Sequence, residues 1–256
     1  MLIVPRRKVG QTPWTPAQIT TALWLDAADA ATITTVSSAV SQWNDKSGNG
    51  RNVSQSTASF RPTYPSNILN GLPAVRFDGT DDRLQTASAF FTTRALAMYV
   101  VARNRNLTGD STLAGQELAT NNNRYIFFTS SSTANRLMLL LCDSSSTTLS
   151  GTPTSSFYIY EYEQSGSIVS LRANGDTATT NSSQSTTNLA STPLVFGAQR
   201  TDGGGFGAVD IGEVVCLPSQ PSDAVRQRVE GYLAHKWGLT GSLPAGHPYK
   251  TSPPYV

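Results

Sequence analysis

Short apolar runs alternate with clusters of Gly, Asn, Asp, Ser and Thr along the chain from Leu23 onward. The runs read LWLD, AVRF, ALAMYVVAR, RYIFFTS, RLMLLLC, FYIYEYE, SIVSLRANG, PLVFGAQ and GAVDIGEVVCL. Many short strands separated by turn residues are typical of a β-sandwich or β-barrel. The Asn-Gly pair within RANGD, residues 172–176, is the strongest short signal for a β-hairpin. We therefore expect an all-β domain.

One segment near the C-terminus departs from this pattern. In SDAVRQRVEGYLAHKWGL the apolar residues recur at helical spacing, and they are Val225, Val229, Tyr232, Leu233 and Trp237. Ser222 suits the N-cap, Asp223 the first turn, Lys236 the last turn and Gly238 the residue after the helix. The sequence predicts one amphipathic helix over residues 222–237.

The two ends of the chain are rich in proline. Pro5, Pro13 and Pro16 fix φ and remove amide donors, so residues 1–20 are predicted to form an extended arm and not a strand inside a sheet. Such an arm packs either on its own domain or on a neighbouring chain. We assign residues 21–250, helix included, to one domain, because sandwiches of this size are commonly single domains. Residues 251–256 form a C-terminal tail.

Composition narrows the classes of function. Charged residues make up 14% of the 256 and the formal net charge is +2, so nothing points to a nucleic-acid partner. No apolar run approaches the ~18–20 residues of a membrane span, and the N-terminal MLIVPRRKVG lacks the apolar stretch of a signal peptide, so we expect neither a membrane partner nor a leader. Cys142 and Cys216 each end an apolar run, as buried thiols do, and pairing between them stays open.

The stretch WNDKSGNGRN, residues 43–52, places oxygen-bearing side chains at alternate positions, as in a calcium loop. Aligned on Asp45, an EF-hand would also use Ser47 and Asn49, but its twelfth position falls on Ser56, where a bidentate Glu is required. Asn, Asp, Ser and Gly each favour turns for their own physical reasons. We interpret the stretch as a turn and expect no cofactor, with Asp45 and Asn49 kept as candidate calcium ligands.

No pattern in the sequence indicates catalysis. Glu161 and Glu163 share one face of a strand, and the spacing of Asp210 and Glu213 predicts opposite faces, but neither pair has a third carboxylate in register. We interpret all four as solvated strand positions. The two histidines lie in the helix and in the proline-rich C-terminal segment, and there is no Gly-x-Ser-x-Gly turn. The chain is not expected to be an enzyme.

Three tyrosines form the clearest candidate binding surface. Tyr158, Tyr160 and Tyr162 alternate along one strand and so line one of its faces. On a concave face their rings could stack against sugars; in the core they would be aromatic packing. We favour core packing or a partner contact over sugar binding, since an aromatic stripe at strand spacing is core by default.

Several segments, in this order, resemble a known family: LWLDAADAATI, WNDKSGNG, RPTY, NGLPAVRFDGTDDRL, SDAVRQRVEGYLAHKWGL and LPAGHPY. Together they are similar to the laminin-G-like, concanavalin A-like domains of tailed-phage virion proteins and secreted bacterial proteins. The resemblance implies an antiparallel two-sheet β-sandwich, a jelly-roll, with one C-terminal α-helix. It also implies that residues 43–52 and 78–82 form tight connections between early strands, and that calcium at the sandwich rim stays an option.

This resemblance, with the missing leader, favours a non-enzymatic structural component on the exterior of a tailed-phage virion, as a capsid decoration, head fibre or tail protein. We expect the arm to anchor it through Arg6, Arg7, Lys8 and Trp14. The partners would be other virion proteins, and a homo-oligomer is expected, with a trimer as one candidate. The alternative is a carbohydrate-binding module, on the particle or extracellular, that recognises host surface glycans with a concave face or its loop tips.

Overall fold

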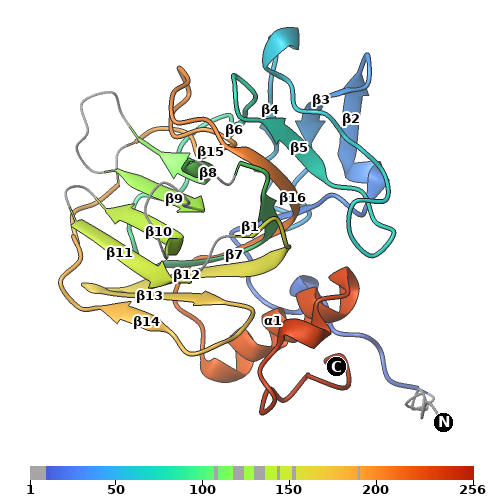
Figure 1. The fold of residues 1–256 in the computed structure, drawn as a ribbon, viewed down its shortest axis with the longest axis vertical. Coiled ribbons are helices and arrows are strands. Elements are labelled where there is room, and N and C mark those ends of the chain that lie inside the picture. The colour runs from blue at the N-terminus through green and yellow to red at the C-terminus, as the bar shows by residue number, and fades with distance from the viewer. Residues whose placement is uncertain are drawn as a thin grey trace.

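The computed structural model describes residues 10–106, 109–117, 124–129, 136–142, 145–151, 154–189 and 191–256, with the backbone alone for 128–129, 136–142 and 145. Within these ranges the strands form two antiparallel sheets (Figure 1). The first has seven strands, in the order β1-β16-β7-β12-β13-β14 with β5 beside β16. They are β1 (Leu23–Asp26), β5 (Val75–Asp78), β7 (Leu96–Asn104), β12 (Tyr158–Ser165), β13 (Ile168–Ala173), β14 (Thr179–Asn181) and β16 (Ala208–Leu217).

The second sheet has nine strands in the described part of the chain, in the order β11-β10-β9-β8-β15-β6-β4-β3-β2. They are β2 (Ile33–Val36), β3 (Ala39–Trp43), β4 (Val53–Ser54), β6 (Leu84–Thr86), β8 (Ser111–Gln116), β9 (Tyr125–Thr129), β10 (Arg136–Cys142), β11 (Ser145–Ser150) and β15 (Val195–Phe196). The helical elements are α1 (Asp223–Trp237) and the short 3-10 turns η1 (Pro16–Gln18), η2 (Ala30–Thr32), η3 (Ala58–Phe60) and η4 (Thr240–Ser242).

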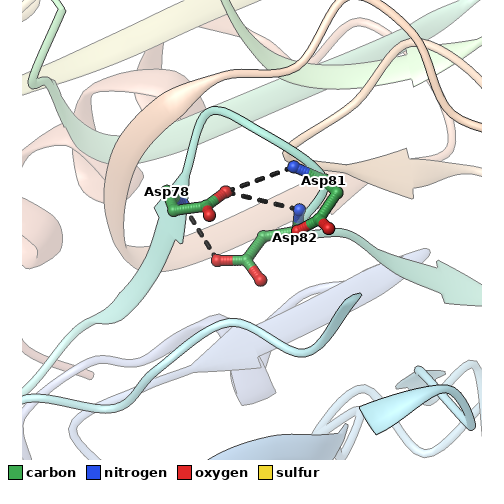
Figure 2. Close-up of side chains that lie close together, drawn as sticks. All are labelled: Asp78, Asp81 and Asp82. Carbon is green, nitrogen blue, oxygen red and sulfur yellow. Dashed lines mark hydrogen bonds between the residues drawn. The ribbon is translucent and has the colours of Figure 1, made fainter. Parts of the chain in front are cut away.

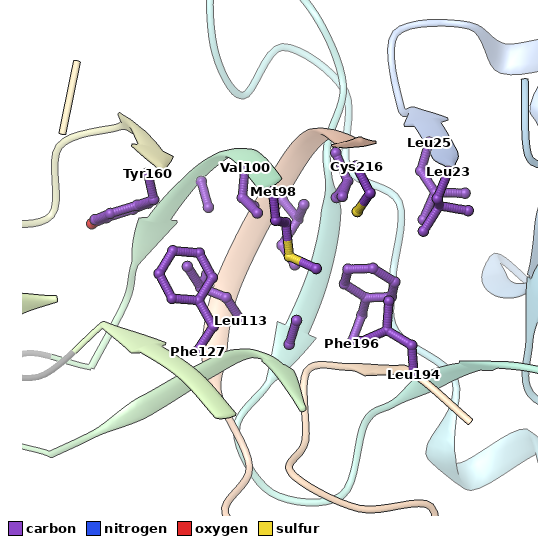
Figure 3. Close-up of a cluster of buried hydrophobic side chains, with 14 of the residues drawn as sticks. Leu23, Leu25, Met98, Val100, Leu113, Phe127, Tyr160, Leu194, Phe196 and Cys216 are labelled. Atoms are coloured by element: carbon purple, nitrogen blue, oxygen red, sulfur yellow. The ribbon is translucent and has the colours of Figure 1, made fainter. Parts of the chain in front are cut away.

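Side chains of the two sheets meet in a hydrophobic core (Figure 3). Successive residues of a strand point to opposite faces, so β7 sends Met98 and Val100 into this core. Leu113 of β8, Phe127 of β9 and Phe196 of β15 reach it from the other sheet. Burying one such Leu or Phe side chain contributes about 1.5–3 kcal/mol. The all-β domain expected from the strand pattern is confirmed, and so is the two-sheet sandwich that the family resemblance implies.

Helix α1 covers the outer face of the seven-stranded sheet (Figure 1). Leu233 and Trp237 of the helix pack against Tyr99 and Val101 of β7 and Ile159 of β12 in a second hydrophobic cluster. The middle of this sheet is therefore buried on both faces. This explains why β7 reads as a continuous apolar run and not as an alternation of apolar and polar residues.

The helix predicted from the sequence is confirmed with its caps. Ser222 Oγ accepts a hydrogen bond from the Val225 backbone N–H at 3.4 Å. Gly238 ends the helix with φ at 71°, in the left-handed region where glycine is favoured. No helix in the described ranges is long and apolar enough to span a membrane.

The two proline-rich ends of the chain pair with each other. The Trp14 N–H donates to the Pro254 carbonyl, and the Val256 N–H donates to the Thr12 carbonyl, both at 3.0 Å. Trp14 is 3% exposed and packs edge-on against Tyr232 of α1, with ring centroids 6.1 Å apart. Of the two destinations open to the arm, its described part therefore packs on its own domain.

Candidate functional site

The carboxylates of β12 and β16 are not solvated, so the sequence-based interpretation of these positions was wrong. Glu161, Asp210 and Glu213 have no exposed surface, and Glu163 is 2% exposed. The helix α1 and the segment after it cover the sheet face around Glu161 and Glu213, while guanidinium groups of neighbouring strands cover Asp210. A strand pattern alone cannot show that a helix from a distant part of the chain will cover its polar face.

Asp210 and Glu213 lie on the same face, where the sequence predicted opposite faces. The pairing of β16 with β7 shifts register between Ile211 and Glu213, so Gly212 is the extra residue of a β-bulge. A Cβ atom at Gly212 would lie 2.8 Å from the Trp237 ring, so glycine lets the helix approach at the bulge. The bulge turns Glu213 toward α1.

Glu213 joins the helix to the sheet. Its Oε1 accepts hydrogen bonds from Trp24 Nε1 at 2.7 Å and from the Tyr232 hydroxyl at 2.9 Å. Its Oε2 accepts from Lys236 Nζ and Trp237 Nε1, both at 2.7 Å. Burial raises the pKa of Glu213, although the Lys236 ammonium opposes this shift. With both oxygens fully engaged, this carboxylate is structural.

Asp210 joins three strands of the same sheet. Its carboxylate accepts two hydrogen bonds from Arg76 of β5, at 2.7 and 3.0 Å, and one from Arg103 of β7 at 2.7 Å. The two guanidinium groups neutralise a carboxylate that has no exposed surface. This cluster is also structural.

Glu161 faces a second buried carboxyl group, Glu230 of α1. The Gly175 N–H donates to Glu161 Oε1 at 2.9 Å, while Glu161 Oε2 has no donor within reach. Burial and the nearby Glu230 charge raise the pKa of Glu161 well above its ordinary 4.5. Two facing carboxyl groups are compatible when they share a proton. We therefore assign the proton to Glu161, which donates it toward Glu230.

Glu230 is the ionised member of this carboxyl pair. Burial acts to raise the pKa of Glu230, but hydrogen bonds from His247, Glu161 and Arg226 outweigh it and lower the pKa. His247 Nε2 lies 2.8 Å from Glu230 Oε2. Because His247 Nδ1 accepts from the Tyr249 N–H at 3.2 Å, the ring proton resides on Nε2, and the imidazole is a neutral donor.

The turn that reaches this pair is the one predicted from the Asn-Gly signal. Asn174 and Gly175 have φ of 55° and 70°, both left-handed, and the Asp176 N–H donates to the Ala173 carbonyl at 3.2 Å. Positive φ at both central residues is typical of a type I′ turn, which joins β13 to the segment leading into β14. The hairpin signal in the sequence thus marks one wall of the candidate site.

A cavity of about 400 Å³ opens beside this turn, and we call it the hairpin–helix cavity. Its lining is mainly polar and comes from the hairpin, the start of α1 and the segment after η4. The lining residues are Arg172, Gly175, Asp176, Thr177, Ala178, Asp223, Arg226, Gln227, Pro244, Gly246 and His247. The buried glutamates do not line it; they hold its wall from behind, through bonds to Arg172, Gly175, Arg226 and His247.

The three tyrosines lie apart from this cavity. Tyr160 and Tyr162 are 1% and 0% exposed and belong to the core between the sheets. Tyr158 is half-buried, and its hydroxyl lies 3.1 Å from Thr154 Oγ1. Rings without exposed faces cannot stack on a sugar, so core packing describes Tyr160 and Tyr162.

The loop that contains Asp45 is a turn held by its own side chains. Asp45 Oδ1 accepts from the Trp24 and Ser47 N–H groups at 3.0 and 2.9 Å, and Oδ2 accepts from Ser47 Oγ and the Arg51 N–H at 2.7 and 3.0 Å. Asn49 Nδ2 donates to the Thr21 carbonyl at 2.9 Å. These bonds account for the polar residues of this stretch without a metal ion.

In the described ranges, three carboxylates that could hold a metal ion lie at the end of β5 and in the turn before β6 (Figure 2). They belong to Asp78, Asp81 and Asp82, and one oxygen of each lies within 4.8 Å of the others. Asp78 Oδ1 accepts from the Thr80 and Asp81 N–H groups, and Asp82 Oδ2 accepts from the Asp78 N–H at 2.9 Å. Burial is the main reason that the pKa of Asp82 is raised to about 6, and the neighbouring carboxylates raise it further. These are the residues best placed to hold a cation, and their own hydrogen bonds also explain the cluster as a tight connection.

The arm residues proposed as an anchor are only partly described. Arg6, Arg7 and Lys8 lie outside the described residues. Trp14 is buried against α1 of its own chain, so its ring is not presented to a neighbour. Cys216 is a buried free thiol in the sandwich core, while the side chain of Cys142 lies outside the described atoms.

No protein-family model matches the chain, and no curated protein matches it. Solved structures resemble it in fold. A Trypanosoma rangeli sialidase in complex with sialic acid aligns with 88% of the chain, at 13% identity and a TM-score of 0.58. An arabinofuranosidase complexed with arabinofuranosyl-alpha-1,2-xylobiose aligns with 82%, at 12% identity and a TM-score of 0.53. The botulinum neurotoxin serotype D ligand binding domain, in complex with N-acetylneuraminic acid, also aligns with 82% of the chain, at 12% identity and a TM-score of 0.53.

The chain spans 36%, 58% and 50% of the lengths of these three proteins. They share its fold. At such low identity the likeness establishes the β-sandwich and not the activity, because one fold supports many unrelated sites.

Proposed function

We propose that this chain is a non-enzymatic carbohydrate-binding module whose ligand enters the hairpin–helix cavity. The observation that carries the proposal is the cavity itself, about 400 Å³ in volume and lined by carboxylate, guanidinium, amide and hydroxyl groups. Sugars present dense hydroxyl groups that both donate and accept hydrogen bonds, so such a lining fits them. Support also comes from the three structural neighbours, which share the sandwich and whose complexes contain sialic acid or an arabinoxylan fragment.

The positions of the carboxyl groups support binding without cleavage. A glycosidase needs an acid and a second carboxylate that both reach the scissile bond. The pair with a shared proton, Glu161 and Glu230, has no exposed surface and lies behind Gly175, Arg226 and His247. Asp176 and Asp223 do line the cavity, but both are exposed to solvent and lack the apolar surroundings in which a glycosidase keeps its acid.

The virion location expected from the sequence stays a prediction, as do jelly-roll connectivity, homo-oligomerisation and the partners on the particle. Neither the fold nor the compared structures bear on them. A glycan-binding module displayed on the exterior of a particle would be both a virion component and a carbohydrate-binding protein, since attachment and recognition use different surfaces. The proposal here concerns recognition.

A glycan array with the purified chain tests this function, beside an assay for new reducing ends on the same polysaccharides. We expect binding without release. Asp176→Ala should weaken the array signal, because it removes a hydrogen-bond acceptor from the exposed rim of the cavity. The matched control is Asp202→Ala, at an exposed aspartate outside the cavity lining, which should bind as the unmodified chain does. Absence of binding to any glycan, or equal binding by Asp176→Ala, would contradict the proposal.

A further inference from the structure

The charges around the hairpin–helix cavity indicate which sugars it accepts. This inference rests on the proposed glycan binding and adds the class of ligand. Its starting point is that each guanidinium at the cavity is already paired with a carboxylate of this chain.

All three nitrogens of the Arg226 guanidinium donate to carboxylates of this chain. Its Nη1 donates to Glu230, and its Nε and Nη2 donate to Asp223 Oδ1 at 3.4 and 3.2 Å. Arg172 donates through Nη1 to Glu163 Oε2 at 3.0 Å and is 14% exposed in its side chain. Its remaining N–H groups have no partner among the described residues. They are available to donate hydrogen bonds to a ligand, although the positive charge of the guanidinium is already balanced by Glu163.

Carboxylates outnumber cations at this site. Behind the wall, Glu163 and Glu230 already balance the two guanidinium groups. At the mouth, Asp176 and Asp223 add further negative charge, and the exposed Asp176 has no cationic partner among the described residues. His247 adds no positive charge, since its Nδ1 accepts a hydrogen bond and its ring is neutral.

The hydrogen-bonding groups left free suit hydroxyl groups. The Asp176 carboxylate accepts, the free N–H groups of Arg172 donate, and the Gln227 amide does both without a side-chain partner in the described chain. A sugar hydroxyl can donate to one of these groups and accept from another. A sugar carboxylate would find no unpaired cation and would face surplus negative charge.

We infer that the hairpin–helix cavity binds sugars through uncharged hydroxyl groups and excludes sugars that carry a carboxylate. The two structural neighbours in complex with sialic acid share the sandwich, so this preference would set the chain apart from them in chemistry and not in fold.

The test uses matched pairs of oligosaccharides on one array, identical except that one member ends in galactose or glucose and the other in N-acetylneuraminic or glucuronic acid. We expect the uncharged member to bind at least tenfold more tightly, with little dependence on salt. The double variant Asp176→Asn, Asp223→Asn removes both negative charges at the rim without changing side-chain size. It should raise the affinity for the acidic member and so reduce the ratio of the two affinities.

Binding that is equal for both members or stronger for the acidic one would overturn the inference while leaving glycan binding intact. An unchanged ratio in the double variant would also overturn it, because the rim charges would then not set the preference. Absence of binding to every sugar on the array would overturn the inference and the proposed function together. Circular dichroism of the double variant confirms that it is folded, since both replaced residues are exposed.

Discussion

Replacing Glu161 by glutamine should stabilise this protein at neutral pH, although Glu161 is completely buried. Glutamine copies the protonated carboxyl group: its Oε1 can accept from the Gly175 N–H, and its Nε2 can donate to Glu230. Unlike glutamate, it has no proton to lose. The substitution therefore keeps both contacts and removes the free-energy cost of holding a carboxyl group neutral above its ordinary pKa.

The sign and size of the effect follow from linkage. Burial and the Glu230 charge raise the folded-state pKa of Glu161 above the ordinary 4.5 of the unfolded chain. The contribution of Glu161 to stability is thus fully present below pH 4.5 and is lost as the pH rises toward the folded-state pKa. In that window the loss is about 1.4 kcal/mol for each pH unit. Glu161→Gln should gain stability over the unmodified chain by the same slope.

Urea unfolding at a series of pH values measures this difference directly. The matched control is Glu163→Gln, two residues along the same strand and equally buried, whose carboxylate accepts from the Tyr99 hydroxyl at 2.9 Å and from Arg172 at 3.0 Å. The Glu163→Gln substitution should lower the free energy of unfolding by about 3 kcal/mol at neutral pH, because it leaves Arg172 without its ion pair. If Glu161→Gln were destabilised similarly, or its advantage did not grow with pH, the shared proton would be wrongly assigned.

Three further substitutions test the rest of the framework by the same unfolding measurement. Lys236→Met should cost about 3 kcal/mol at neutral pH, since it leaves the buried Glu213 carboxylate without its ion pair, whereas Asp26 keeps its ion pair with Lys46. This cost should shrink in acid, and a constant cost would contradict this. Asp210→Asn should lower the free energy of unfolding by roughly 3 kcal/mol, because it leaves two arginines without their ion pair. Unchanged stability would contradict this. Gly197→Ala should lose roughly 2–5 kcal/mol, because φ is 79° and the new Cβ would lie 2.1 Å from the Phe77 ring; a loss below about 1 kcal/mol would contradict the close approach.

Local features of the fold were readable from the sequence because their physics is local. Ser222 and Gly238 mark the ends of α1 through cap geometry that involves only a few neighbouring residues. The Asn174–Gly175 pair predicts its turn because few residues other than asparagine and glycine adopt positive φ readily. The short apolar runs between turn residues likewise predict strands in a sandwich or a barrel, and the structure confirms the strands and shows the sandwich.

The candidate site required the tertiary structure because its residues are distant in the sequence. The hairpin–helix cavity joins Arg172, Asp176, Gln227 and His247, whose proximity depends on how α1 docks on the sheet. None of them belongs to a catalytic or ligand-binding motif, and the segments that contain them signalled only a turn, a helix and a family resemblance.

Burial and the side-chain direction of charged residues were likewise decided only in three dimensions. A glutamate at a strand position reads as solvated until another element covers that face, as α1 covers Glu161 and Glu213. The bulge at Gly212 then reverses the direction of Glu213 relative to a regular strand. The sequence by itself thus determined the strands, the helix and the all-β class, through short-range conformational preferences and hydrophobic patterning. The docking of the helix determined which charges are buried and where the cavity opens, because electrostatics and packing act between residues that only folding brings together.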